Sequence, residues 1–133
     1  MNILFFLTPK SEVAYISTED TVRQTLEKME YHRYSSIPMI NRNGKYVGTI
    51  TEGDLLWYIK ERGEFSLSED ENIPITSIKR KQDNRPVYIS SNIEDLVSKA
   101  MSQNFVPVID DDDIFIGIVT RKDIMNYLCN NRK

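Results

Sequence analysis

Two short stretches of the chain carry the residues best suited to holding a small molecule. They read Gly48-Thr-Ile-Thr51-Glu-Gly-Asp54 and Gly117-Ile-Val-Thr120-Arg-Lys-Asp123, so both have the pattern Gly-x-x-Thr-x-x-Asp. If a helix begins after each threonine, its free backbone N–H groups and partial positive charge can bind a phosphate, with the threonine hydroxyl as a further donor. The aspartate would repel phosphate and is better suited to accepting hydrogen bonds from ligand hydroxyls.

The same pattern also has a purely structural interpretation. A threonine at the N-cap of a helix and an acidic residue three positions later form a variant of the capping box, in which side chains and backbone satisfy one another. The two interpretations are compatible, because a capped helix start can still receive a ligand.

The two motifs differ in charge between their threonine and aspartate. The first has Glu52-Gly53 at these positions, and the second has Arg121-Lys122. Because cations favour a bound phosphate, we expect the second motif to be the dominant phosphate site. The alternative is that Arg121 and Lys122 are only solvated residues of a first helical turn.

Both motifs belong to an internal repeat at an offset of 69 residues. Of the 23 positions in 37–59, six are identical to their counterparts in 106–128, and eight others exchange one apolar residue for another. Each copy predicts a β-hairpin followed by an amphipathic helix. Upstream, the extended segments 13–16 and 86–89 each precede a polar cap and another amphipathic helix. The sequence therefore predicts an α/β fold of two pseudo-twofold related units, each ordered strand-helix-strand-strand-helix.

The repeat divides the chain into three parts. We expect the first unit at residues 1–63, with the apolar N-terminal segment covering one of its hydrophobic edges, and the second unit at 84–133. Residues 64–83 are polar and charged apart from an apolar stretch at 73–78, which predicts a linker with a short docked helical turn.

The repeated unit resembles the CBS domain, present twice and covering nearly the whole chain. The resemblance rests on the order of elements, the apolar-Pro-apolar strand and the Gly-x-x-Thr-x-x-Asp motif before the last helix. It implies a tandem pair with two clefts that bind adenine nucleotides, and pairs that associate into homodimers. Segments 6–14 and 34–38 are further similar to stand-alone bacterial CBS-pair proteins, some of which bind cyclic di-AMP.

The resemblance also assigns the ligand contacts. Phosphate and ribose are expected at Thr51, Asp54, Thr120 and Asp123, with Arg121 and Lys122 as added cations. Adenine needs an apolar slot, which nearby residues can line, although strand residues are equally expected in the core. The candidates are Ala14, Tyr15, Tyr34, Ser35, Ile37 and Pro38 in the first unit and Tyr88, Val106 and Pro107 in the second.

We expect neither a catalytic nor a metal site. The sequence has no nucleophile-base-acid set, metal-ligand spacing or Gly-rich phosphate loop. Asp110-Asp-Asp-Asp113 suggests calcium, but its counterpart Asn41-Arg-Asn-Gly44 has no acid, which favours a solvated hairpin turn. The single histidine, His32, has no evident catalytic partner. We therefore predict a protein that is not an enzyme and needs no cofactor.

Composition narrows the partners and the compartment. A net charge of -3 with scattered basic residues argues against nucleic-acid binding, and the apolar start is too short for a membrane span. A single cysteine, Cys129, cannot form an intrachain disulfide, which fits the cytoplasm. Trp57 occupies the repeat position that corresponds to Asn126. It is expected on the outer side of its helix. This favours a homodimer formed through the last helix of each unit.

Together these features predict a sensor that binds an adenine nucleotide and signals to a partner protein of unknown identity. AMP, ADP, ATP, cyclic di-AMP and S-adenosylmethionine all stay open as ligands. The alternative function is a constitutive protein-interaction module without a physiological nucleotide. Nucleotide titration separates the two, because a ligand that binds only the folded state raises its melting temperature.

Overall fold

A computed structural model describes residues 2–62 and 72–130. The chain divides into two compact units. The first unit contains the first repeat copy and comprises residues 14–62 and 72–83. The second unit contains the second copy and comprises residues 2–13 and 84–130. The predicted boundary at residues 63 and 64 lies outside the described part of the chain.

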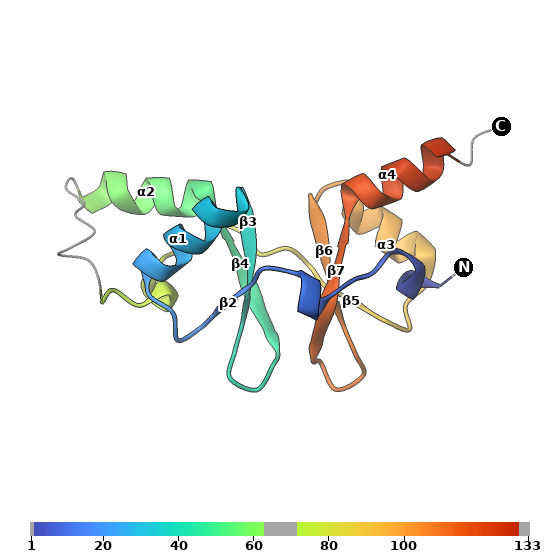
Figure 1. Cartoon of the computed structure of the whole chain (residues 1–133), viewed down its shortest axis with the longest axis horizontal. Helices are drawn as coiled ribbons and strands as arrows, with labels where there is room; N and C mark the ends of the chain where they lie inside the picture. Colours follow the sequence, from blue (N-terminus) through green and yellow to red (C-terminus); the bar gives the residue numbers. More distant parts are fainter. Residues whose placement is uncertain (1, 63–71, 131–133) are drawn as a thin grey trace. The chain divides into compact units, whose positions relative to one another are not determined.

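The first unit is a three-stranded sheet with two helices (Figure 1). Its elements are β2 (Ile16–Ser17), α1 (Val22–His32), β3 (Ser36–Ile40), β4 (Tyr46–Thr51) and α2 (Glu52–Arg62). The strand order is β2-β3-β4, with β2 parallel and β4 antiparallel to β3. The predicted order of elements is confirmed in this copy.

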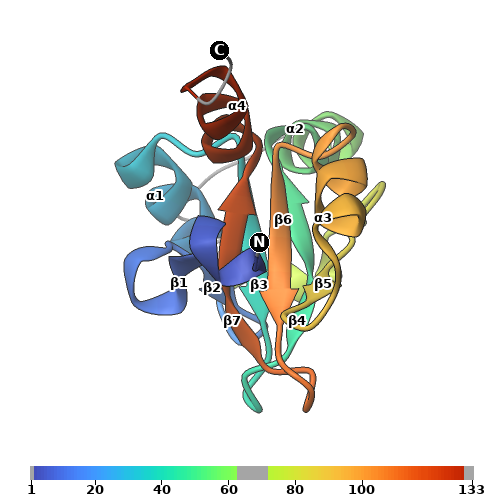
Figure 2. The ribbon, with the colours of Figure 1, turned by 90° about the vertical axis from the view of Figure 1, so that its right-hand side faces the viewer.

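The second unit repeats this arrangement. It contains β5 (Val87–Tyr88), α3 (Ile93–Ala100), β6 (Phe105–Ile109), β7 (Phe115–Thr120) and α4 (Arg121–Asn130). β5 is parallel and β7 antiparallel to β6, and α3 lies beside β6 in Figure 2. The second copy therefore has the predicted order of elements as well.

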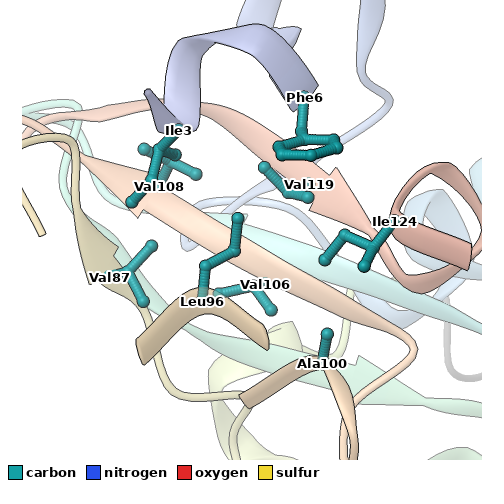
Figure 3. Packing of buried hydrophobic residues seen from close by; sticks show 9 residues of the cluster. All are labelled: Ile3, Phe6, Val87, Leu96, Ala100, Val106, Val108, Val119 and Ile124. Carbon is teal, nitrogen blue, oxygen red and sulfur yellow. The ribbon is translucent and has the colours of Figure 1, made fainter. Parts of the chain in front are cut away.

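Each unit has its own hydrophobic core, formed by strand residues and the apolar sides of the helices. Burying one such side chain contributes about 1.5–3 kcal/mol. The core of the first unit consists of Ile16, Val22, Met29, Ile37, Met39, Ile50, Leu55, Ile75 and Ile78. The core of the second unit, drawn in Figure 3, consists of Ile3, Phe6, Val87, Leu96, Ala100, Val106, Val108, Val119 and Ile124.

A segment from outside the repeat copy completes the second unit. The 3-10 helix η1 (Ile3–Phe6) adds its apolar side chains to the core, and β1 (Thr8–Pro9) pairs antiparallel with β7 before the short helix η2 (Lys10–Glu12). The N-terminal segment was expected on the first unit, and this part of the prediction is wrong. In the first unit, η3 (Ile75–Ser77) from the linker already fills the corresponding place, with Ile75 in the core.

The helix starts are fixed by side-chain caps. Thr21 accepts from the Gln24 backbone N–H at 3.2 Å, and the Gln24 side chain accepts from the Thr21 N–H at 2.8 Å, which is a complete capping box. Asn92 caps α3 by accepting from the Asp95 N–H at 2.8 Å. Thr21 and Asn92 are 71 residues apart, so the caps give the alignment of the two copies upstream of the hairpins.

The two hairpins use the same turn. Asn41 Oδ1 accepts from the backbone N–H groups of residues 43 and 45, and Asp110 Oδ1 accepts from those of residues 112 and 114. Gly44 and Asp113 both have positive φ, at 83° and 65°. The run of four aspartates therefore forms a hairpin turn, as predicted, and Asp110 stabilises it through its carboxylate.

Candidate functional site

The first motif lies where β4 ends and α2 begins. The Thr51 hydroxyl accepts from the Asp54 backbone N–H at 3.1 Å, and Asp54 Oδ2 accepts from the Thr51 N–H at 3.1 Å. The capping interpretation of this motif is therefore confirmed. Both side chains are held by the helix start that they cap.

Asp54 has a second partner in the linker. Its Oδ1 accepts from the Lys81 backbone N–H at 3.2 Å, and the residue is only 5% exposed. Each carboxylate oxygen thus already has a backbone donor. The charge of Asp54 is also favourable beside the N-terminus of α2.

The linker contacts the first unit at a further point, on β4. Asp83 Oδ1 accepts from the Thr49 N–H at 3.0 Å and from Arg80 Nε at 2.8 Å. The Arg80–Asp83 pair covers Gly48, where a Cβ atom would come within 2.5 Å of Asp83 Oδ1. Below it, the hydroxyls of Tyr46 and Thr49 are 2.6 Å apart, and burial raises the pKa of Tyr46 above its usual value.

The second motif has the same backbone but a different surrounding. The Thr120 hydroxyl accepts from the Asp123 N–H at 3.1 Å, so the threonine caps α4 as Thr51 caps α2. Asp123 is half-buried, and within residues 2–62 and 72–130 its carboxylate accepts no hydrogen bond. Of the two motif aspartates, Asp123 is therefore the more exposed.

Two predicted cations stand at this second helix start. Arg121 Nε donates to the Ala100 carbonyl at 2.8 Å, which fixes the side chain at the end of α3. The guanidinium remains exposed, as does Lys122. The first helix start has the acidic Glu52 in place of Arg121, also exposed.

Tyr88 does not lie at this corner. It pairs with Ile109, at the far end of β6 from Phe105, which pairs with Thr120. A hydrogen bond to Asp113, at the hairpin turn, raises the pKa of Tyr88. The segments 13–16 and 86–89 are two residues out of register with each other, because Ile16 and Val87 occupy equivalent strand positions opposite Met39 and Val108.

The corrected register brings Arg85 to the second corner instead. The Arg85 N–H donates to Gln103 Oε1 at 2.8 Å, and Gln103 Nε2 donates to the carbonyls of Arg85 and Phe105 at 3.1 and 3.2 Å. Arg85 is therefore beside the end of β6 that pairs with Thr120. Its side chain is exposed. The cap spacing of 71 residues, which aligns Arg85 with Ala14, was the signal that could have found it.

The strand candidates divide between the cores and the corner. Buried strand positions are Ile37, Pro38, Val106 and Pro107. Ala14 and Tyr34 pack partly exposed against the first core, and the carbonyl of exposed Ser35 accepts from the Glu52 N–H at 2.9 Å. The Tyr15 carbonyl accepts from Lys28 Nζ at 2.8 Å. Among these candidates the partly exposed ones retain surface for a ligand.

Other residues that can do chemistry have structural surroundings. The His32 ring stacks near Tyr31 and Tyr34, at centroid distances of 4.9 and 5.4 Å. Cys129 is an exposed free thiol on α4. Across residues 2–62 and 72–130, no group of three or more His, Cys, Asp and Glu side chains is arranged to hold a metal ion. No helix in the same ranges is both long and apolar enough to cross a bilayer.

The family model of the CBS domain matches residues 6–61 and 78–130. The chain belongs to the CBS domain family. The two matched ranges correspond to the two repeat copies, so the resemblance drawn from the repeated motif is confirmed. Both CBS copies carry the Gly-x-x-Thr-x-x-Asp pattern at the start of their last helix.

Curated relatives contain this CBS region as part of longer chains. Inosine-5'-monophosphate dehydrogenase of Methanocaldococcus jannaschii is 27% identical over 118 residues, which cover 86% of this chain and 21% of that enzyme. An uncharacterized protein of Methanopyrus kandleri is 26% identical over 116 residues, covering 82% of this chain and 54% of that protein. The chain thus spans between about a fifth and about half of the length of these relatives.

Solved structures match over nearly the whole CBS chain. CbpB in complex with c-di-AMP aligns with a TM-score of 0.84 at 25% identity, covering 98% of this chain and 85% of that one. A CBS domain protein from Streptococcus pneumoniae TIGR4 aligns with a TM-score of 0.84 at 26% identity, covering 96% and 86%. The predicted α/β fold is confirmed by these matches.

Proposed function

We propose that this CBS protein is a regulatory sensor that binds an adenine nucleotide, AMP, ADP, ATP or cyclic di-AMP, and passes the signal to a partner protein. The observation that carries the proposal is the match to CbpB in complex with c-di-AMP over 98% of the chain. It is supported by the second motif, where a capped helix start, an available carboxylate and exposed cations lie together.

The proposed contacts follow from the chemistry of that corner. The positive end of the α4 dipole and the Thr120 hydroxyl bind phosphate, Arg121 and Lys122 neutralise it, and Asp123 accepts from ribose hydroxyls. The partly exposed Ala14, Tyr15, Tyr34 and Ser35 remain candidates at the first corner. No step of bond making or breaking is assigned, because the proposed role is binding and not catalysis.

Titration calorimetry with AMP, ADP, ATP and cyclic di-AMP tests the proposal, together with mass spectrometry of any molecule that copurifies. We expect one of these nucleotides to bind and to raise the melting temperature, since it binds only the folded state. Thr120→Ala with Asp123→Ala should abolish that shift. If no adenine nucleotide binds and none copurifies, the alternative of a constitutive interaction module replaces this proposal.

We further propose that the protein forms a homodimer through its last helices. A groove of about 1150 Å³ lies on the first unit between α1 and α2. Its walls include the apolar Leu26, Leu56 and Ile59 and charges of both signs, Arg23, Arg33, Glu27, Glu30 and Glu52. A patch with both signs can pair with its own copy across a twofold axis. Exposed Trp57 on α2 and exposed Met125 and Leu128 on α4 also favour such contacts.

We propose the cytoplasm as the working compartment. The lone cysteine, Cys129, is an exposed free thiol, and such thiols persist in a reducing environment. Fractionation of the expressing cell followed by immunoblotting tests this placement.

A further inference from the structure

The two aspartates of the repeated motif have different surroundings. Asp54 is 5% exposed, and its two oxygens accept from the backbone N–H groups of Thr51 and Lys81 at 3.1 and 3.2 Å. Asp123 is half-buried, and no donor in the described ranges reaches its carboxylate. The two aspartates therefore differ in burial and in hydrogen bonding, although they occupy equivalent repeat positions.

The partner of Asp54 belongs to a segment that is fixed at a second point. Two residues after Lys81, Asp83 accepts from the Thr49 N–H at 3.0 Å and from Arg80 at 2.8 Å. Residues 80–83 thus bond to β4 through the Asp83 carboxylate and to the start of α2 through the Asp54 carboxylate. Thr49, the donor of one of these bonds, is 0% exposed, and the bond itself is part-buried.

Asp54 offers a nucleotide little access, because the residue is only 5% exposed and both of its carboxylate oxygens already accept from backbone N–H groups. A ribose hydroxyl that replaced the Lys81 N–H would also leave that linker amide without its acceptor. At Asp123 a hydroxyl meets a carboxylate that accepts no hydrogen bond from the described parts of the chain, residues 2–62 and 72–130. The difference favours Asp123 even where the two corners have similar backbones.

We propose that Asp54 is a positioning residue that fastens the linker to the first unit, and that Asp123 is the only motif aspartate that takes a ligand hydroxyl. Each chain then binds at most one nucleotide molecule. The proposal rests on the proposed nucleotide binding for its ligand part, whereas its linker part concerns the folded chain alone.

The isosteric pair Asp54→Asn and Asp123→Asn tests both parts, with AMP and cyclic di-AMP as probes in calorimetry. Asp123→Asn should raise Kd at least about tenfold and leave the melting temperature of the ligand-free protein nearly unchanged. Asp54→Asn should leave Kd within about twofold and lower the melting temperature by roughly 5 °C, because its amide nitrogen faces a backbone donor. A wild-type stoichiometry of two nucleotides per chain, or weakened binding in Asp54→Asn, overturns the proposal.

A second set of variants decides the linker part without any ligand. Lys81→Pro removes the donating N–H, and Lys81→Ala keeps it as the matched control. Lys81→Pro should lower the melting temperature more than Lys81→Ala, and it should add little when Asp54 is already asparagine. Fully additive losses would show that the Asp54–Lys81 bond does not fasten the linker. If wild type binds neither these probes nor ADP or ATP, the proposed function fails, and this cycle still decides the role of Asp54.

Discussion

The carbonyl oxygen of Thr8 lies directly against Gly117, where a Cβ atom would come within 2.2 Å of it. Gly117 also has a φ of 154°, a region that residues with a side chain rarely adopt. β1 can therefore pair with β7 only because this position is glycine. We expect Gly117→Ala to destabilise the protein by about 3 kcal/mol, as backbone strain and a steric clash add.

Gly53→Ala is the matched control for this substitution. A Cβ atom at Gly53 would meet only the Thr51 hydroxyl at 3.6 Å, an ordinary contact, and the position is helical. We expect a stabilisation of up to about 1 kcal/mol, because alanine favours helix over glycine. Urea denaturation of both variants measures the difference, and equal effects would contradict this account of Gly117.

The contacts around Gly117 also show what the sequence could and could not predict. The hairpins and last helices were predictable because their signals, turn residues and apolar spacing, are local. The unit against which the N-terminal segment packs was not predictable, because an apolar stretch fits the surface of either of two similar units. In the first unit, Ile75 of the linker contributes to the core instead.

The candidate site shows the same division. The caps of both motifs were predictable from residue type and spacing. The difference between Asp54 and Asp123 was not, because the donor to Asp54 is a backbone amide of the linker, and a backbone amide has no sequence signature. The strand register was not predictable either, because the segments 13–16 and 86–89 look alike in sequence, whereas strand pairing aligns Ile16 with Val87.

Removal of the charged side chain at each of the two helix starts tests which of them binds phosphate. Arg121→Ala should weaken AMP or cyclic di-AMP binding about tenfold or more, since a charge-assisted hydrogen bond contributes roughly 1.5–3 kcal/mol. Glu52→Ala, at the equivalent position of the first copy, should leave affinity within about twofold. Calorimetry at two salt concentrations measures both, and unchanged affinity in Arg121→Ala would rule out its role.

Arg85 provides a separate test of the corrected strand register. Because it lies at the Thr120 end of the sheet, Arg85→Ala should reduce affinity for a polyphosphate such as ATP by about threefold to tenfold. Its backbone bonds to Gln103 do not involve the side chain, so the melting temperature should stay the same. Arg42→Ala, in the hairpin turn, is the control; an equal loss of affinity there would indicate only a general charge effect.

The half-buried Tyr46 predicts a dependence of stability on alkaline pH. Burial raises the pKa of Tyr46, so the folded state keeps its proton where the unfolded chain, with a pKa near about 10, loses it. The contribution of Tyr46 to the free energy of unfolding is therefore fully present below a pH of about 10 and is lost as the pH rises above it. Free energies of unfolding between pH 8 and 11, in roughly half-unit steps, should fall more steeply in wild type than in Tyr46→Phe. Parallel profiles would contradict the assignment.

Trp57 tests the proposed homodimer. Trp57 is 56% exposed on α2, and Lys60 Nζ lies 5.2 Å from its ring centroid. The corresponding position of the second repeat copy is Asn126. If two copies meet through these helices, Trp57→Ala should weaken dimerisation about tenfold or more, as for a central aromatic anchor. Tyr31→Ala, another exposed aromatic, at 83%, which lies on α1 and not on a last helix, should have no effect. Sedimentation velocity over a concentration series distinguishes these outcomes. A wild-type protein that stays monomeric at high concentration would contradict the proposed dimer. Equal losses of dimer affinity in both variants would show that the interface is not centred on α2.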